Sequence, residues 1–300
     1  MILRTLPFAM LPIAAFADAP TVVTDIAPIH SLTAMVMDGV GTPHLLLPPN
    51  ADPHSFALRP SDAAHLEDAQ VIVWVGHALS PWLEAPLETL APDAINLELM
   101  ETRGWEKLAY AEDAHEDHED HEEDHGDGHN HAGEFDPHAW LSPTAASVWV
   151  AQIAESLSTA DPANASTYTA NAAAAAARLT SLSADITESL HQTKPTGFVL
   201  PHAAMQYFET EFGVTAAGTI SNTDAADPGP AHIAELKAEM GDVTCVLHDP
   251  QNDKWARLLT EGTGAKMAPL DLMGSTIPLG VDHYAATIRA IADTLQDCTS

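Results

Sequence analysis

From residue 22 onward, short β-rich runs alternate with stretches suited to helices. In the first half of the chain these runs lie at residues 22–24, 45–47, 71–75 and 94–97. The third run, Val71-Ile72-Val73-Trp74-Val75, is apolar at every position, which is typical of a parallel strand buried on both faces. Ser61-Asp62 predicts a helix cap between the second and third runs. The pattern predicts an α/β lobe with a mainly parallel sheet.

The same rhythm returns in the second half, with β-rich runs at residues 197–200, 214–216, 243–247 and 265–267. Helical stretches are expected near residues 204–212, 230–240 and 252–261. Between the two halves, residues 161–193 are rich in alanine and contain no proline after Pro162. We expect one long helix there, joining an N-terminal lobe (18–160) to a C-terminal lobe (194–300), and a pair of shorter helices is the alternative.

Residues 1–17 have the features of a cleaved signal peptide. A single basic residue, Arg4, precedes an apolar run from Leu6 to Phe16, and the small residues Ala15 and Ala17 stand just before Asp18. The run is too short to span a bilayer, and no cysteine near the cleavage site could carry a lipid. The sequence therefore predicts a mature protein without a membrane anchor, in a periplasm-like compartment.

Such a compartment permits disulfides, and the chain has two cysteines, Cys245 and Cys298. They could join the terminal helix to the strand expected at residues 243–247. Two free thiols are the alternative.

Composition points to a cation as the ligand. The formal net charge is -32, from 43 acidic and 11 basic residues, and the chain has 17 histidines. A negative charge of this size argues against nucleic acid and anionic lipid as partners. An acidic surface alone also serves solubility, so the histidines carry more weight than the charge does.

Residues 112–134 differ from the rest because they are almost entirely His, Asp and Glu, with no apolar face to bury. We expect a disordered loop that binds several zinc ions weakly, and a merely solvated acidic segment is the alternative. The histidines concerned are His115, His118, His121, His125, His129 and His131. Within them, His121-Glu122-Glu123-Asp124-His125 matches a zinc-protease pattern, but that motif requires a packed helix, which this composition disfavours.

Three other histidines each follow a proline, near expected strand ends. They are His54 in Asp52-Pro53-His54, His138 in Asp136-Pro137-His138, and His202 in Pro201-His202. Ligands of open α/β folds bind at the carboxyl ends of the strands, so these three are the candidate metal ligands. Any one alone would more often be a hydrogen-bonded structural residue. The remaining histidines include such cases: His30, His65, His77, His191, His232, His248 and His283.

At these positions the chain resembles a known family. The segments 49–62, 136–143 and 202–208, the acidic His-rich loop and a late Pro269-Leu270-Asp271 look like those of the zinc-binding proteins of bacterial zinc ABC importers. The resemblance covers nearly the whole mature chain. It implies two α/β lobes joined by one long helix, Zn²⁺ held between them by His54, His138 and His202, and a disulfide between Cys245 and Cys298. It also implies a monomer that delivers zinc to a membrane permease.

The fourth ligand stays open, because some relatives carry glutamate immediately before the first histidine and this chain has Pro53. Asp271 is the candidate by resemblance and water the competitor; Asp271 could equally cap the turn that follows its strand. Three imidazoles suit zinc, whereas manganese favours more oxygen ligands. Two alternatives to a transport protein remain: a zinc hydrolase using the same histidines, with Glu209 or Glu211 as base, and a zinc buffer acting through the loop.

Overall fold

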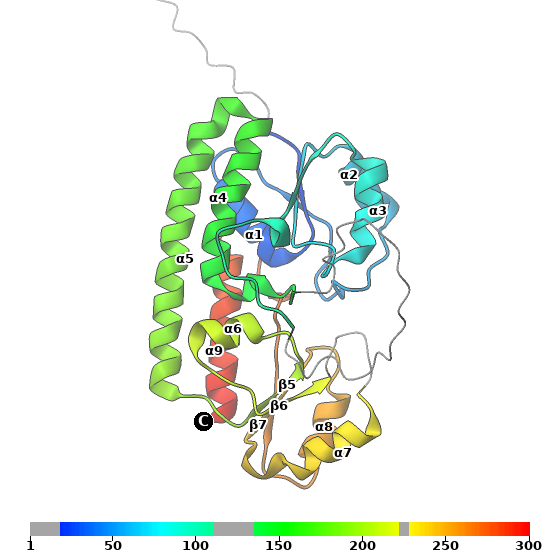
Figure 1. The fold of residues 1–300 in the computed structure, drawn as a ribbon, viewed down its shortest axis with the longest axis vertical. Coiled ribbons are helices and arrows are strands. Elements are labelled where there is room, and N and C mark those ends of the chain that lie inside the picture. Colours follow the sequence, from blue (N-terminus) through cyan, green and yellow to red (C-terminus); the bar gives the residue numbers. More distant parts are fainter. Residues whose placement is uncertain (1–18, 111–134, 222–227) are drawn as a thin grey trace, which may run out of the picture.

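Two parallel four-stranded sheets form the framework of the protein (Figure 1). The computed structural model describes residues 19–110, 135–221 and 228–300. The N-terminal sheet has the order β2-β1-β3-β4, with β1 (Val22–Thr24), β2 (His44–Leu45), β3 (Val71–Trp74) and β4 (Ile95–Glu98). The C-terminal sheet has the order β6-β5-β7-β8, with β5 (Phe198–His202), β6 (Gly218–Ser221), β7 (Cys245–His248) and β8 (Lys266–Pro269). The predicted α/β fold with two lobes is confirmed.

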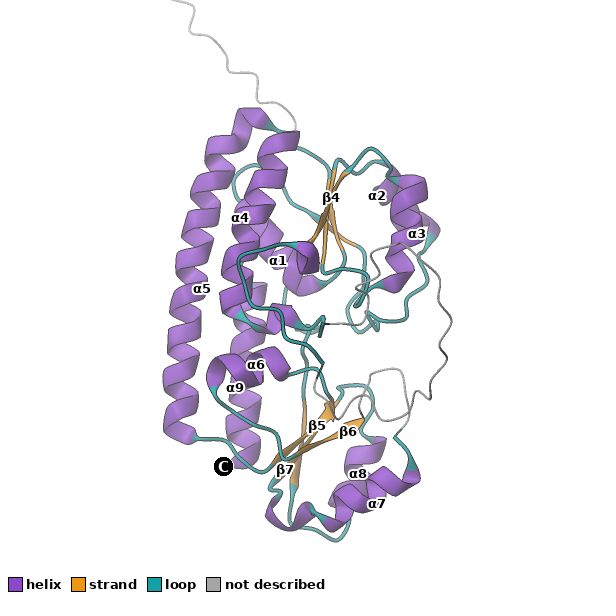
Figure 2. Cartoon of the chain, in the orientation of Figure 1, coloured by secondary structure: helices purple, strands orange, loops and turns teal. Residues whose placement is uncertain are grey.

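Helices cover both faces of the N-terminal sheet (Figure 2). Val71 and Val73 of β3 join the core formed with α1 (Ala27–Val36) and α4 (Pro143–Ala160). Ile72 and Trp74 face the opposite side and pack with side chains of α2 (Pro60–Glu67) and α3 (Pro81–Leu90). A strand enclosed in this way needs apolar residues at every position, which explains the uninterrupted run in the sequence.

The C-terminal sheet is covered in the same manner. Phe198 and Leu200 of β5 pack on the side of α6 (Gln206–Phe212) and α9 (His283–Thr299). Val199 packs on the side of α7 (Pro230–Ala238) and α8 (Lys254–Thr260).

Two long helices run beside both lobes. The helix α5 (Ala165–Thr193) is continuous and follows a short 3-10 turn, Pro162–Asn164, so the prediction of one long helix is confirmed. The helix α9 also reaches across, because it contacts α1 in one lobe and β8 in the other (Figure 1). One continuous cluster of buried side chains includes residues of both sheets together with α5 and α9. A shared core of this kind restricts any opening of the lobes by rotation about a hinge.

Two predicted boundaries were wrong. The strand expected at residues 214–216 is β6, four residues later, because Gly213 ends α6 in the left-handed conformation (φ 66°) and Val214 packs into the core without joining the ladder. The helix expected from Ser61-Asp62 begins at Pro60. Asp62 instead lies in its first turn, where its carboxylate accepts hydrogen bonds from the backbone and guanidinium nitrogens of Arg59.

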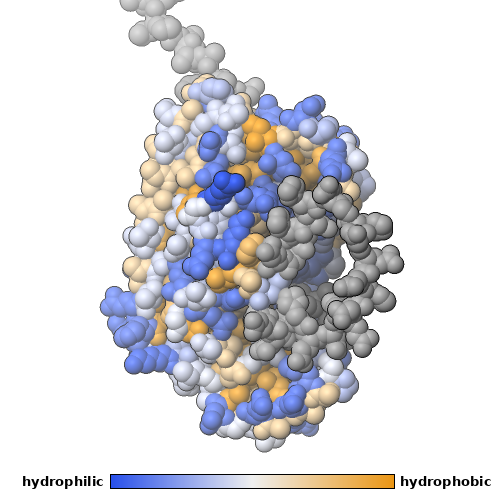
Figure 3. Space-filling view, viewed as in Figure 1, coloured by the Kyte–Doolittle hydropathy of each residue, from blue (hydrophilic) through white to orange (hydrophobic). Residues whose placement is uncertain are grey.

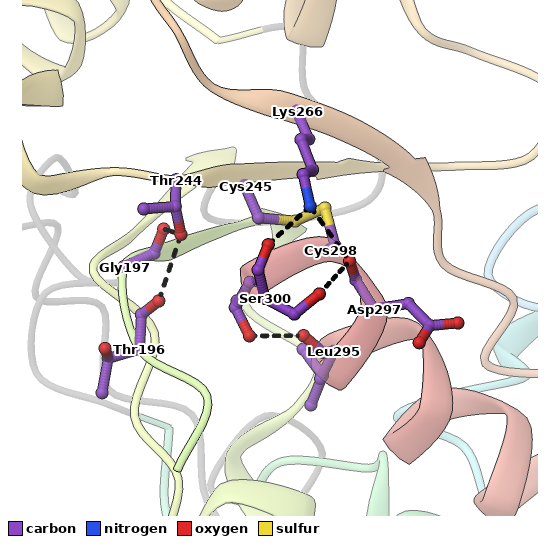
Figure 4. Close-up of a disulfide and its surroundings, with 10 residues drawn as sticks. Thr196, Gly197, Thr244, Cys245, Lys266, Leu295, Asp297, Cys298 and Ser300 are labelled. Atoms are coloured by element: carbon purple, nitrogen blue, oxygen red, sulfur yellow. Dashed lines mark hydrogen bonds between the residues drawn. A yellow bond between two sulfur atoms is a disulfide. The ribbon is translucent and has the colours of Figure 1, made fainter. Parts of the chain in front are cut away.

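The disulfide between Cys245 and Cys298 is present, as the resemblance implied (Figure 4). It joins the first residue of β7 to the last turn of α9, with the two Cα atoms 5.4 Å apart. Lys266 of β8 donates a hydrogen bond from Nζ to the backbone oxygen of Ser300 at 2.6 Å. Lys266 Nζ also donates to the backbone oxygen of Asp297, so the end of α9 is fixed to the sheet by the disulfide and by polar contacts of Lys266.

The surface seen in Figure 3 is mostly hydrophilic, with hydrophobic residues in separate patches. Among the described residues, the large apolar side chains that are well exposed are Leu258 and Leu279. None of the helices in residues 19–110, 135–221 and 228–300 is long and apolar enough to cross a membrane.

Candidate metal site

A cavity of about 340 Å³ lies between the lobes, where loops from both sheets meet. Most of its lining residues lie at or soon after the carboxyl ends of β1, β2, β5, β7 and β8, which is the expected place for a ligand in parallel α/β sheets. Asp52, Asp249 and Asp271 line it, whereas no lysine or arginine of the described chain does so. The charge of this lining favours a cation over an anion.

His138 lies at the wall of this cavity and is held by Asp136. The residue is 6% exposed and directly precedes the short 3-10 helix Ala139–Leu141. Its ring Nδ1 lies 2.6 Å from Oδ1 of the buried Asp136, which also accepts a hydrogen bond from the backbone N–H of His138 at 2.9 Å. A carboxylate only accepts hydrogen bonds, so Nδ1 carries the proton and Nε2 carries the lone pair that can coordinate a metal.

His202 approaches from the other lobe, as the last residue of β5. It pairs in the sheet with Ser221 of β6, so the strand fixes its backbone. Its ring centroid lies 5.8 Å from that of His138.

His54 completes the group from the loop between β2 and α2. Its ring centroid lies 5.5 Å from that of His138. The preceding Asp52 and Pro53 line the cavity, whereas His54 itself is not among the lining residues. Asp52 accepts a hydrogen bond from the backbone N–H of His54 at 2.9 Å, which repeats the relationship between Asp136 and His138. Two separate Asp-Pro-His segments therefore use the same local turn to present a histidine.

The ring of His138 lies within 6 Å of the rings of both His54 and His202, close to the spacing that zinc requires. Two imidazoles bound to one tetrahedral zinc, with zinc–nitrogen distances of about 2.0–2.1 Å, have centroids roughly 5 Å apart. The observed separations of 5.5 and 5.8 Å are slightly larger. Within the described residues, no group of three or more His, Cys, Asp or Glu side chains is yet close enough to hold an ion. Coordination thus needs the rings to move together by a small amount.

Comparison with known proteins identifies the family of the chain. A model of the family described as zinc-uptake complex component A, periplasmic, matches residues 22–298. The chain belongs to this family. The high-affinity zinc uptake system proteins ZnuA of Brucella suis and Paracoccus denitrificans are each 35% identical to it, over 93% and 97% of this chain and 91% and 94% of theirs.

Solved structures show the same fold at lower identity. The Zn(II)-bound ZnuA-like domain of Streptococcus pneumoniae AdcA has a TM-score of 0.68 at 24% identity, covering 93% of this chain and 99% of that domain. The AdcAII protein of Streptococcus pneumoniae has a TM-score of 0.72 at 22% identity, covering 92% of this chain and 98% of its own. This chain therefore shares its two-lobed fold with both structures.

Asp271, the predicted fourth ligand, follows β8 and lines the same cavity as His138 and His202. Its Oδ1 accepts a hydrogen bond from the backbone N–H of Met273, and its Oδ2 accepts from the backbone and hydroxyl of Ser275. This is the turn-capping role considered as the alternative. A carboxylate has further lone pairs, so its role as a ligand stays a prediction, with water as the competitor.

The two glutamates considered as a hydrolytic base have structural roles. Glu209 accepts a hydrogen bond from the backbone N–H of Ala216 at 2.7 Å, and burial raises the pKa of its carboxyl. Glu211 binds the hydroxyls of Ser142, Thr144 and Ser183, which connects α6 to the start of α4 and to α5. Neither glutamate lines the cavity.

Several other histidines are structural. His30 Nε2 bonds the carbonyl oxygen of Pro43, His232 Nε2 that of Thr219, and His283 Nε2 that of Met273. The six histidines of the acidic loop and the signal peptide lie outside the described residues, so both remain predictions.

Sequence reasoning missed the role of Asp136 in orienting His138. The repeated Asp-Pro-His segments were the available signal, because an aspartate two residues before a ligand can bond both its backbone and its ring. Trp82 of α3 also contacts the loop that carries His54, through a hydrogen bond to the carbonyl oxygen of Pro53. Nothing in the sequence signalled this contact.

Proposed function

We propose that this protein captures Zn²⁺ in the periplasm with His54, His138 and His202 and delivers it to the membrane permease of a zinc ABC importer. The observation that carries this proposal is the convergence of three imidazoles from three separate segments, two in one lobe and one in the other. Membership of a zinc-uptake family supports zinc as the cargo. The Zn(II)-bound state of a structural neighbour is consistent with that choice.

Each of these residues has a different role in zinc binding. His138 is the fixed ligand because Asp136 sets its tautomer and orientation before zinc arrives. His202 supplies a ligand from the second lobe, so zinc bound by both would link the lobes. Asp271 or a water molecule fills the fourth position. The acidic lining draws the cation toward the cavity.

The protein acts as a binding component and not as an enzyme. A hydrolase would need a general base beside the metal, and both glutamates weighed for that part are engaged in structural hydrogen bonds away from the cavity. The signal peptide 1–17 would direct export, and the mature protein would act as a monomer. The histidines of residues 112–134 would hold zinc transiently before it passes to the cavity.

Calorimetric zinc titration of three mature proteins at neutral pH tests the proposal. They are the intact chain, the chain without residues 112–134, and that deleted chain with His54, His138 and His202 changed to alanine. We expect one tight site that is lost only in the third protein. Tight binding that survives in the third protein would contradict the cavity assignment, and tight binding lost on loop deletion alone would favour a buffer.

Proton competition offers a second check. An imidazole must lose its proton to coordinate zinc, so affinity should fall as the pH drops through about 6.5. An affinity that is the same at neutral and acid pH would count against a histidine site.

A further inference from the structure

His54 differs from the other two histidines in what fixes it. His202 belongs to a strand, and His138 is buried against Asp136. His54 lies in a loop, residues 46–59, that has no helix or strand, and it is only partly buried. A ligand on such a loop binds weakly unless other contacts hold it, because ordering the loop opposes binding.

The local turn alone does not fix the loop in space. Asp52 accepts hydrogen bonds from the backbone of His54 and the hydroxyl of Ser55, at 2.9 and 2.7 Å. These bonds connect residues three or fewer apart, so they give the loop its shape but move with it. Contacts to a more distant element must set its position.

The side chain of Trp82 supplies such contacts on both sides of His54. Its indole Nε1–H donates a hydrogen bond to the carbonyl oxygen of Pro53 at 2.8 Å. Its ring also meets the ring of Phe56 edge to face, with centroids 5.1 Å apart. Trp82 is itself well held, because it lies in the first turn of α3 and packs against the two clusters on opposite faces of the N-terminal sheet.

We infer that Trp82 is a positioning residue for the metal ligand His54. It fixes the residue before His54 by a hydrogen bond and the residue two after it by ring packing, which holds the imidazole near His138. The inference rests on the proposed function, since it requires His54 to bind zinc. Loss of the indole hydrogen bond should weaken zinc binding about tenfold while leaving His138 and His202 in place.

The test is a double-mutant cycle on the intact mature chain, with zinc affinity measured by competition against a chromophoric chelator. The variants are Trp82→Phe, His54→Ala and the two combined. Trp105→Phe is a matched control, because Trp105 is also half-buried, donates its indole N–H to Thr102 at 2.9 Å and meets Trp149 edge to face at 5.4 Å. Thermal unfolding of each variant monitors the fold.

We expect Trp82→Phe to lose affinity, Trp105→Phe to retain it, and Trp82→Phe to have no further effect once His54 is alanine. Normal affinity in Trp82→Phe, or equal losses with and without His54, would overturn the inference while leaving the ligand assignment intact. Normal affinity in His54→Ala would overturn both. If Trp82→Phe does not fold, Phe56→Leu tests the ring contact between Trp82 and Phe56. Its loss of zinc affinity should likewise disappear once His54 is alanine.

Discussion

Gln251 of the C-terminal lobe donates a hydrogen bond from its side-chain nitrogen to the backbone carbonyl oxygen of Asn50 in the N-terminal lobe, at 2.8 Å. Both residues line the cavity, and Asn50 stands four residues before His54 in the same loop. Asn50 also adopts the left-handed conformation, φ 67°, which asparagine tolerates better than most residues. The bond therefore connects the loop that carries one proposed ligand to the opposite lobe.

Removal of this connection should speed the release of zinc. We expect Gln251→Ala to raise the zinc dissociation rate several-fold, since one exposed hydrogen bond contributes about 1 kcal/mol. Stopped-flow transfer to a chelator measures the rate. Gln192→Ala is the control, because Gln192 bonds only within its own helix, to Glu188. Equal rates in both variants would mean that the contact with Asn50 does not retain the metal.

The orientation of His138 by Asp136 predicts a loss of affinity without a change in the ligand set. Asp136→Asn keeps the size of the side chain but weakens its hold on ring Nδ1. Zinc affinity should fall about 10- to 100-fold, the range found when such supporting residues are changed. Asp52→Asn is the comparison, since Asp52 bonds the backbone of His54. A larger loss of zinc affinity in Asp52→Asn than in Asp136→Asn would mean that Asp52 is the more important support for a metal ligand.

The disulfide should contribute to stability more than to binding. It closes a loop with a sequence separation of 53 residues, and a loop of this size contributes about 4 kcal/mol to the free energy of unfolding in the chain-entropy model. Urea unfolding of Cys245→Ala/Cys298→Ala should show this loss, while calorimetry shows zinc binding unchanged. Reduction of the unmutated protein supplies the control and should give a similar loss.

Asp25 predicts a pH dependence of stability. Its carboxyl is fully buried at the end of β1 and accepts hydrogen bonds from the backbone N–H groups of Ile26 and Val75; burial raises its pKa to about 7. The folded state therefore holds a proton that the unfolded state releases near pH 4. This residue makes the free energy of unfolding fall as the pH rises from about 4 to about 7.

The comparison that checks this is Asp25→Asn against the unmutated protein, by urea unfolding at pH 5 and pH 7.5. The variant should gain stability relative to the unmutated protein at the higher pH, by up to a few kcal/mol. The exposed Asp38→Asn controls for the loss of one negative charge. If the free energies of unfolding of Asp25→Asn and the unmutated protein differ by the same amount at both pH values, the carboxyl of Asp25 is not protonated in the folded state.

The sequence predicted the sheets well because buried parallel strands are apolar at every position, as at Val71 to Trp74. It misplaced β6, because Val214 is as apolar as a strand residue although it packs beyond the helix end set by Gly213. Apolar character reports burial and does not separate a core residue in a loop from one in a ladder.

The site was predictable only in part for a similar reason. Proline and aspartate before a histidine are visible along the chain, so His54 and His138 could be selected. Contacts between distant segments are not visible there: Trp82 lies 29 residues from Pro53, and Gln251 lies 201 residues from Asn50. Such pairs depend on how α3 and the lobes pack, which one sequence does not state.

The contact between the first and last helices has a consequence for the order of folding. Ser31 in α1 accepts a hydrogen bond from the backbone N–H of Tyr284 in α9, 253 residues later, and α1 packs against that helix. A chain emerging amino-terminus first exposes the apolar side of α1 long before α9 exists to cover it. We therefore expect the N-terminal lobe to complete its core only after α9 has been synthesised, which leaves the chain incompletely folded until then.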